Sequence, residues 1–164
     1  MALRGNKVVI SSPQNGKQRA GVLGDTSAAG TCMEIQTPFY QGGQHLYRAF
    51  QPGTDGLRRQ VIVLLEDDIQ GFGILKSDGT PNAGVSGTMR QFYWPVPGDE
   101  MNMLIKDIAG TADDHTAGDL LIINTGTGKL IASTGSEQSD PFVLLETVID
   151  PTADFYSPCM FTGY

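Results

Sequence analysis

The chain has 164 residues, of which 40 % are hydrophobic and 18 % charged, and its net charge at pH 7 is −7. This length fits one domain or two small halves, and it is enough to bury a core without disulfides or metals. The acidic balance argues against a protein that grips nucleic-acid phosphates, and the lack of a long apolar run argues against a membrane span or a secretory signal. We therefore expect neither a nucleic acid nor a membrane as a partner.

Residues 1–30 are polar and rich in Gly, Ser and Asn, and their cationic side chains all precede the first acidic residue, Asp25. This composition predicts an extended arm with one β segment, ahead of a β-rich domain over residues 31–164. The basic and apolar residues through which such an arm would contact a partner or a neighbouring copy are Arg4, Lys7, Val8, Val9, Ile10, Lys17 and Arg19. The alternative is a solvated basic tail. In either case, deletion of residues 2–24 would leave the domain folded.

From Thr31 onward, short stretches rich in β-branched and aromatic residues alternate with clusters of Gly, Pro, Asn and Asp, as is typical of sandwiches and barrels. The expected strands are 32–37, 45–50, 59–66, 72–76, 88–94, 101–106, 120–124, 129–132, 142–148 and 159–162. No segment carries a sustained helical stripe. The fold class predicted is all-β, a compact sandwich or barrel-like domain.

One short sequence occurs twice. Val63–Glu66 and Val143–Glu146 both read Val-Leu-Leu-Glu and lie 80 residues apart. Unbroken apolar runs of this kind indicate strands covered on both faces, and hence central strands. The echo is either a pseudo-repeat of two equivalent strands or a chance identity between Leu-rich segments.

The glycine motifs do not complete any phosphate-binding or nucleophile signature. Asn124–Lys129 contains Gly-Thr-Gly-Lys, but a phosphate-binding loop needs a glycine where Ile123 stands and a Ser or Thr where Leu130 stands. We interpret this segment as a hairpin turn. Gly71–Gly73 lacks the third glycine of a dinucleotide fingerprint, and Gly84–Thr88 lacks the final glycine of a nucleophile elbow.

The sequence has few residues that could bind a metal or act as a reactive thiol. The histidines are His45 and His115, and the acids of 113–119 lack the alternating spacing of a cation loop, which favours a solvated acidic loop. Cys32 and Cys159 lie too far apart in sequence for a metal or redox motif, so we expect both to be reduced and buried, with a long-range disulfide as the alternative. We predict no catalytic residue, no metal site and no cofactor, and therefore no enzyme.

Three consecutive aromatic residues, Phe92, Tyr93 and Trp94, form the most conspicuous candidate for a partner platform. In a strand, Phe92 and Trp94 share one face and Tyr93 occupies the other. Aromatic side chains of this kind either stack on a sugar or a partner protein, or pack into the core.

The C-terminal two-thirds of the chain resembles the capsid decoration, or cement, proteins of tailed bacteriophages. The resemblance rests on residues 45–52, 59–68, 95–103, 117–131 and 141–146. Its strongest element is an order of features: Gly-Asp, an apolar strand, the Gly-Thr-Gly-Lys hairpin, a second apolar strand, and a buried strand that ends in Glu. The resemblance implies a compact β-fold of the β-tulip type, often a homotrimer, docked on the outside of the head.

The function implied is that of a virion structural protein, made in the host cytoplasm, that binds the major capsid protein on the outer capsid surface and stabilises capsomer contacts. The arm would add a strand to a neighbour, and several copies together would bind with avidity. Two other functions have less support from the residues. A trimeric deoxyuridine triphosphatase would need a glycine-rich C-terminal motif that Ser157–Phe161 does not supply. A virion-associated carbohydrate-binding or adhesin module would rest on the three aromatic residues.

Overall fold

A computed structural model describes residues 7–13, 16–41, 44–50, 61–66, 73–106, 115–133, 141–149, 151 and 153–163. Its regular elements are all strands, which confirms the all-β prediction. They are β1 (Val9–Ser11), β2 (Lys17–Leu23), β3 (Ser27–Ala28), β4 (Cys32–Gln41), β5 (Gln44–Phe50), β6 (Val61–Leu64), β7 (Ala83–Gly84), β8 (Met89–Trp94), β9 (Glu100–Ile105), β10 (Leu120–Ile123), β11 (Leu130–Ala132), β12 (Phe142–Leu144) and β13 (Phe155–Phe161). Within these ranges no helix is long and apolar enough to cross a membrane.

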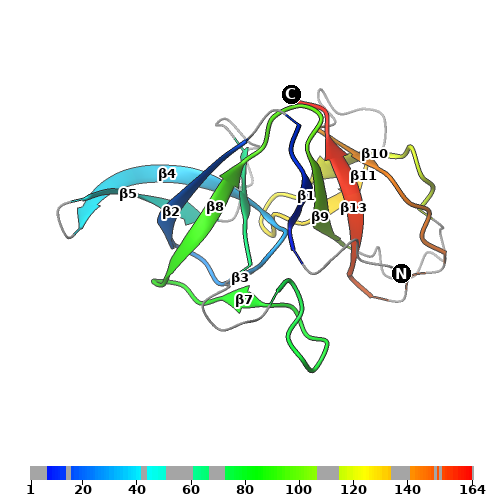
Figure 1. Cartoon of the computed structure of the whole chain (residues 1–164). Coiled ribbons are helices and arrows are strands. Elements are labelled where there is room, and N and C mark those ends of the chain that lie inside the picture. Colours follow the sequence, from blue (N-terminus) through cyan, green and yellow to red (C-terminus); the bar gives the residue numbers. More distant parts are fainter. Residues whose placement is uncertain are drawn as a thin grey trace.

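The N-terminal half forms a closed five-stranded barrel in the order β2-β5-β4-β6-β8, here called the first barrel (Figure 1). β2 and β5 are parallel, and every other neighbouring pair is antiparallel. The barrel interior is a compact cluster of buried apolar side chains, namely Leu23, Met33, Ile62, Leu64 and Phe92. A small two-stranded sheet, β3–β7, lies beside it.

The C-terminal half closes in a similar way. Its sheet runs β1-β9-β11-β10-β12-β13, and β9 pairs again with β13, so that β9, β11, β10, β12 and β13 form a ring that we call the second barrel. β9 and β11 are parallel, meeting at Ile105 and Leu130, and the other pairs of the ring are antiparallel. β1 is an additional strand on β9.

The two barrels have the same topology. In chain order, each has its first strand parallel to its third, its third and fourth beside its second, and its fifth between its fourth and first. Their registers coincide as well. The pairing row Cys32, Val63, Tyr93, Gln18 of the first barrel corresponds to the row Leu120, Val143, Met160, Glu100 of the second.

Local hydrogen bonds repeat together with the strands. Gly30 N donates to Leu64 O at 2.8 Å, and Gly118 N donates to Leu144 O at 2.7 Å; both glycines have positive φ, 78° and 98°. Each of these leucines in turn donates its N–H to the carbonyl oxygen of the residue after the glycine. The Val-Leu-Leu-Glu echo therefore marks the fourth strand of each barrel, and the pseudo-repeat is confirmed.

The described part of the first thirty residues, 7–13 and 16–30, is not an extended arm. β1 pairs with β9, and β2 is a wall strand of the first barrel; Val8 and Leu23 are fully buried. The predicted boundary at 30/31 thus falls inside the first barrel, between β3 and β4. The pattern was misleading because β2 is polar and exposed over its first three residues and buried only over its last three, which leaves little apolar signal.

The predicted strands otherwise correspond to observed ones, with one exception. Over the described part of 72–76, only Leu75 pairs, in an isolated bridge to Pro81. β13 begins at Phe155, four residues earlier than expected, and includes Pro158. The earlier start escaped the sequence pattern because proline is disfavoured within a central strand.

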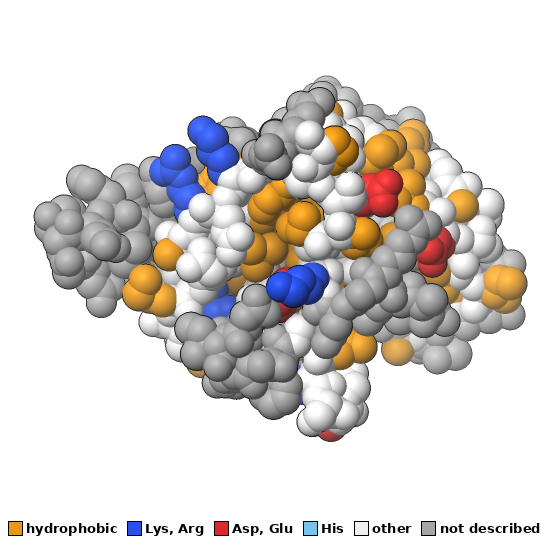
Figure 2. All heavy atoms as spheres, in the orientation of Figure 1, with side chains coloured by type: hydrophobic (Ala, Val, Ile, Leu, Met, Phe, Trp, Pro, Cys, Tyr) orange, Lys and Arg blue, Asp and Glu red, His pale blue; other side chains and the backbone are white. Residues whose placement is uncertain are grey.

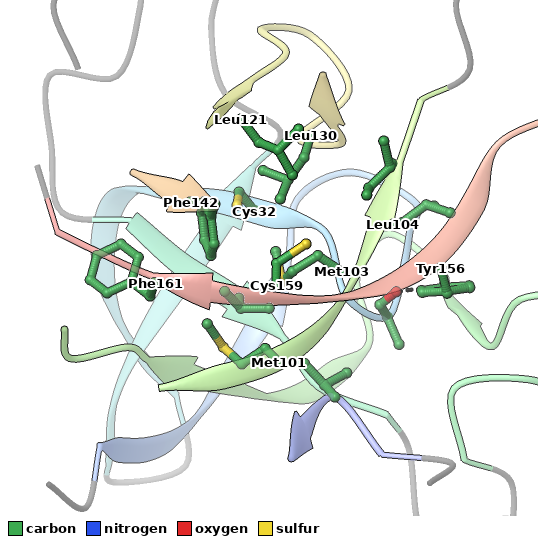
Figure 3. Close-up of a cluster of buried hydrophobic side chains, with 14 of the residues drawn as sticks. Cys32, Met101, Met103, Leu104, Leu121, Leu130, Phe142, Tyr156, Cys159 and Phe161 are labelled. Atoms are coloured by element: carbon green, nitrogen blue, oxygen red, sulfur yellow. Dashed lines mark hydrogen bonds between the residues drawn. The ribbon is translucent and has the colours of Figure 1, made fainter. Parts of the chain in front are cut away.

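The barrels share a core at their contact. In β6, Ile62 and Leu64 point into the first barrel, whereas Val63 belongs to the larger cluster of the second barrel, together with Leu65, which follows the strand. Cys32 also reaches that cluster, from β4, and Figure 3 draws it among the side chains of the second barrel. This two-sided burial explains the unbroken apolar run of β6 and confirms that β6 is a central strand. β12 lies between β10 and β13, with Phe142 and Leu144 buried and Val143 half-buried.

Candidate interaction surfaces

The junction between the barrels includes hydrogen bonds to the backbone of the segment that leads into β4. Cys32 N donates to Gly128 O at 2.8 Å, Leu104 N donates to Gly30 O at 2.9 Å, and the Tyr156 hydroxyl donates to Ala29 O at 2.6 Å. Burial raises the pKa of Tyr156, so its hydroxyl stays protonated and keeps this bond at ordinary pH. The junction is thus a continuous part of the fold.

The outward side of the first barrel at this junction is apolar. Its side chains are Cys32, Val63, Leu65 and Tyr93, all of them buried; we call this set the junction face. Because barrel walls exposed to water usually alternate apolar and polar residues, an apolar outer wall signals a covering partner. Here the second barrel is that partner.

Both thiols lie in the shared core and are free. The pKa of Cys32 is raised, chiefly by burial and secondly by the nearby Cys159 sulfur, and burial also raises the pKa of Cys159. The expectation of two reduced, buried cysteines is confirmed.

Since a thiolate is the reactive form, we predict that a thiol-specific reagent titrates neither cysteine in the native protein near neutral pH and both in denaturant. Absorbance of the released chromophore measures this. Fast stoichiometric labelling of the folded protein would contradict the burial described.

The aromatic run lies mainly in the cores. Phe92 is 1 % exposed inside the first barrel, and Tyr93 is 4 % exposed on the junction face. The Tyr93 hydroxyl donates to Asp99 Oδ2 at 2.6 Å and lies 2.7 Å from Ser12 Oγ. Burial, followed by the hydrogen bond to Asp99, raises the pKa of Tyr93 to about 12. Trp94 is half-buried and packs against the first barrel's cluster.

The platform prediction for Phe92, Tyr93 and Trp94 is therefore wrong in its main part, because two of the three rings are unavailable to a ligand. The core alternative holds for them, since successive residues of β8 supply the two cores on either side of the same wall. The adhesin hypothesis loses the feature on which it rested.

The predicted contact residues divide into two groups. Val8 is buried, its N–H donates to Glu66 Oε2 at 2.9 Å, and Val9 packs on the shared core. The strand addition expected with a neighbour thus occurs within the chain, where β1, including half-buried Ile10, pairs with β9. By contrast, Lys7, Lys17 and Arg19 are exposed. Arg4 lies outside the described residues.

The exposed cations make the surface at the start of β2 basic. Lys17, Gln18 and Arg19 are successive exposed residues at the start of β2. Figure 2 shows Lys and Arg side chains on the β2 side of the face in view, and Asp and Glu side chains on the side of the second barrel. The basic residues singled out in β2 therefore remain candidates for contact with an acidic partner, presented by a rigid barrel.

A groove of about 550 Å³ lies between the β3–β7 sheet, the 124–129 hairpin and the start of β13. Its lining is mainly apolar and hydroxyl-bearing, and its charged side chains, Lys129 and Asp154, form an ion pair with each other. Across the described ranges no three His, Cys, Asp or Glu side chains form a metal-ligand group. His115, expected on a solvated loop, is buried with its ring 5.2 Å from that of Phe155.

No family model matches the sequence, and no curated protein matches it. Among solved structures, the chain is similar to the N base of the head fiber protein gp8.5 of bacteriophage phi29, with a TM-score of 0.51 and 6 % sequence identity. The match covers 90 % of this chain and 95 % of the solved N-base chain. At this identity the likeness establishes a common fold, and it extends over both barrels.

Proposed function

We propose that the protein is a non-enzymatic structural component of a tailed-phage virion, which binds the major capsid protein on the outer surface of the head and stabilises capsomer contacts as a homotrimer. The observation that carries this proposal is the fold shared with the base of a phage head fiber over nearly the whole of both chains. The resemblance of residues 45–164 to decoration proteins in the order of their features points to the same role.

The surface that we assign to the capsid is the exposed basic start of β2, with Lys17 and Arg19. Two cations on a rigid strand lose little conformational freedom on docking, and they suit an acidic patch on a shell. Because exposed charges act mainly through long-range attraction, we expect this contact to weaken as salt is raised.

The test is co-sedimentation with heads of the encoding phage that were assembled without the protein. We expect binding that saturates at a fixed number of copies per head and a rise in the temperature at which heads disrupt. Lys17→Glu with Arg19→Glu should weaken binding by about tenfold or more, since each rim charge contributes a modest amount. The matched control, Lys76→Glu with Lys106→Glu, reverses two other exposed cations and should leave binding nearly unchanged. Absence of both binding and head stabilisation by the unaltered protein would reject the proposal.

A further inference from the structure

The two barrels provide an internal comparison, because the positions that pair in both barrels can be matched by register. Interior positions agree closely. Leu23, Met33, Ile62, Leu64 and Phe92 correspond by register to Ile105, Leu121, Phe142, Leu144 and Cys159. All ten side chains are buried in the hydrophobic clusters.

The outer faces differ in what covers them. The counterparts of the junction face, Cys32, Val63, Leu65 and Tyr93, are Leu120, Val143, Leu145 and Met160. We call this second set the β10–β13 face. It is apolar at all four positions, as the junction face is, but Leu120 is 50 % exposed where Cys32 is fully buried, and the other three are half-buried.

The second barrel's side of the junction also has a counterpart, which lies on the first barrel and is exposed. Tyr156, 3 % exposed, lies on the second barrel's side, where its hydroxyl reaches Ala29 O. By register it corresponds to Met89, since Met89 pairs with Val22 as Tyr156 pairs with Leu104. Met89 is 55 % exposed.

Leu120 and Met89 are among the exposed large apolar side chains of the described residues. Both are counterparts of residues that are buried from opposite sides of one internal contact. A wall strand that faces water on one side normally alternates apolar and polar residues. β10, with the sequence Leu-Leu-Ile-Ile, is apolar on both faces, as β6 is, yet Leu120 on its outer face is 50 % exposed, whereas Val63 on the outer face of β6 is fully buried.

We infer that the β10–β13 face binds a second copy of this chain, on the side of its first barrel that carries Met89, so that the contact between barrels within one chain is repeated approximately between chains. The contact is heterologous, with different patches on the two partners. Contacts of this kind form a closed ring when the rotation between copies allows it. The inference rests on the oligomeric part of the proposed function and names the surfaces that oligomer would use.

The experiment is sedimentation velocity of the purified full chain over a range of concentrations, without heads. The unaltered protein should associate. Leu120→Asp and Met89→Asp should each weaken self-association by about 30-fold or more, because a charge is then buried at the centre of an apolar contact. Ile149→Asp is the matched control: Ile149 is 71 % exposed but is not among the counterpart residues, and the variant should associate normally.

A mixture provides the sharper test. The Leu120→Asp copy keeps an intact Met89 side, and the Met89→Asp copy keeps an intact β10–β13 face, so the two should form a one-to-one dimer although neither associates alone. A monomeric unaltered protein, an equal loss in Ile149→Asp, or a mixture that stays monomeric would each overturn the inference. Urea unfolding checks that each variant is folded, and Leu120→Ser or Met89→Ser replaces any that is not.

Because no heads are present, this result is separate from the co-sedimentation result. A chain that binds heads but stays monomeric in solution would overturn the self-association inference and the homotrimer of the proposed function, and it would leave the binding to the capsid standing. A chain that associates through these faces but does not bind heads would do the reverse.

Discussion

Deletion of residues 2–24 is expected to unfold the protein. The deletion removes β1 and β2, and β2 pairs with β8 along six residue pairs, so the first barrel would be left open. It also removes Leu23 and Val8, both fully buried. Truncating one buried leucine costs about 2–5 kcal/mol, against about 5–15 kcal/mol for a whole domain, so loss of a wall strand exceeds the available stability. Circular dichroism during heating should show no cooperative transition.

The matched control for this deletion keeps β2 and removes only its exposed charges. Lys17→Ala with Arg19→Ala should change the free energy of unfolding by at most about 0.5 kcal/mol per site, because both side chains are exposed. A truncated chain with a native spectrum and a cooperative transition would restore the interpretation of residues 1–30 as an arm.

Among alanine substitutions in the 124–129 hairpin, Gly128→Ala is expected to lower the free energy of unfolding most. Gly128 has φ of 72°, and a Cβ there would overlap Cys32 O, a backbone atom of the other barrel. The backbone cannot yield without breaking the bond from Cys32 N to Gly128 O that joins the barrels. We expect a loss of about 4 kcal/mol or more in the free energy of unfolding, the range of severe core lesions.

Gly126→Ala is the control that separates the cost of the left-handed backbone from the cost of the overlap with Cys32. Gly126 lies in the same hairpin with φ of 87°, but a Cβ there would have nothing within 4 Å. It should lose only the about 1–2 kcal/mol that a left-handed conformation costs a non-glycine residue. Urea denaturation of the two variants measures the difference. Equal losses would mean that the junction does not constrain Gly128.

The two barrels share one topology, but only some of their equivalent strands have similar sequences. The fourth strands share Val-Leu-Leu-Glu, and both have a buried inner face and make the same backbone hydrogen bonds to the segment ahead of the second strand, so these parts of their environments select similar residues. The first strands, β2 and β9, have different environments. β2 has an exposed polar start, whereas the equivalent part of β9 is covered by β1, so their sequences show no visible similarity.

The aromatic run at residues 92–94 shows how far the sequence could predict the candidate site. Alternation along β8 predicted that Phe92 and Tyr93 point to opposite sides, which is what the structure has. Whether the outer side faces a ligand or another barrel depends on the path of segments far along the chain, such as the strand that carries Tyr156. The counterpart position of Tyr93, Met160, is half-buried, although it occupies the same place in its own barrel.

Local sequence patterns were sufficient for the all-β class, most strand positions, the hairpin at 124–129 and the burial of both cysteines, because turn chemistry and side-chain alternation act over a few residues. Three features needed the three-dimensional arrangement: that β2 completes a barrel, that the halves share one register, and which outer face is covered. Strand partners and ring closure join residues far apart in the chain, and register depends on which faces meet, which no local pattern encodes. The apolar β10–β13 face, half-buried at three positions and exposed at Leu120, could be identified only by comparison with its buried counterpart.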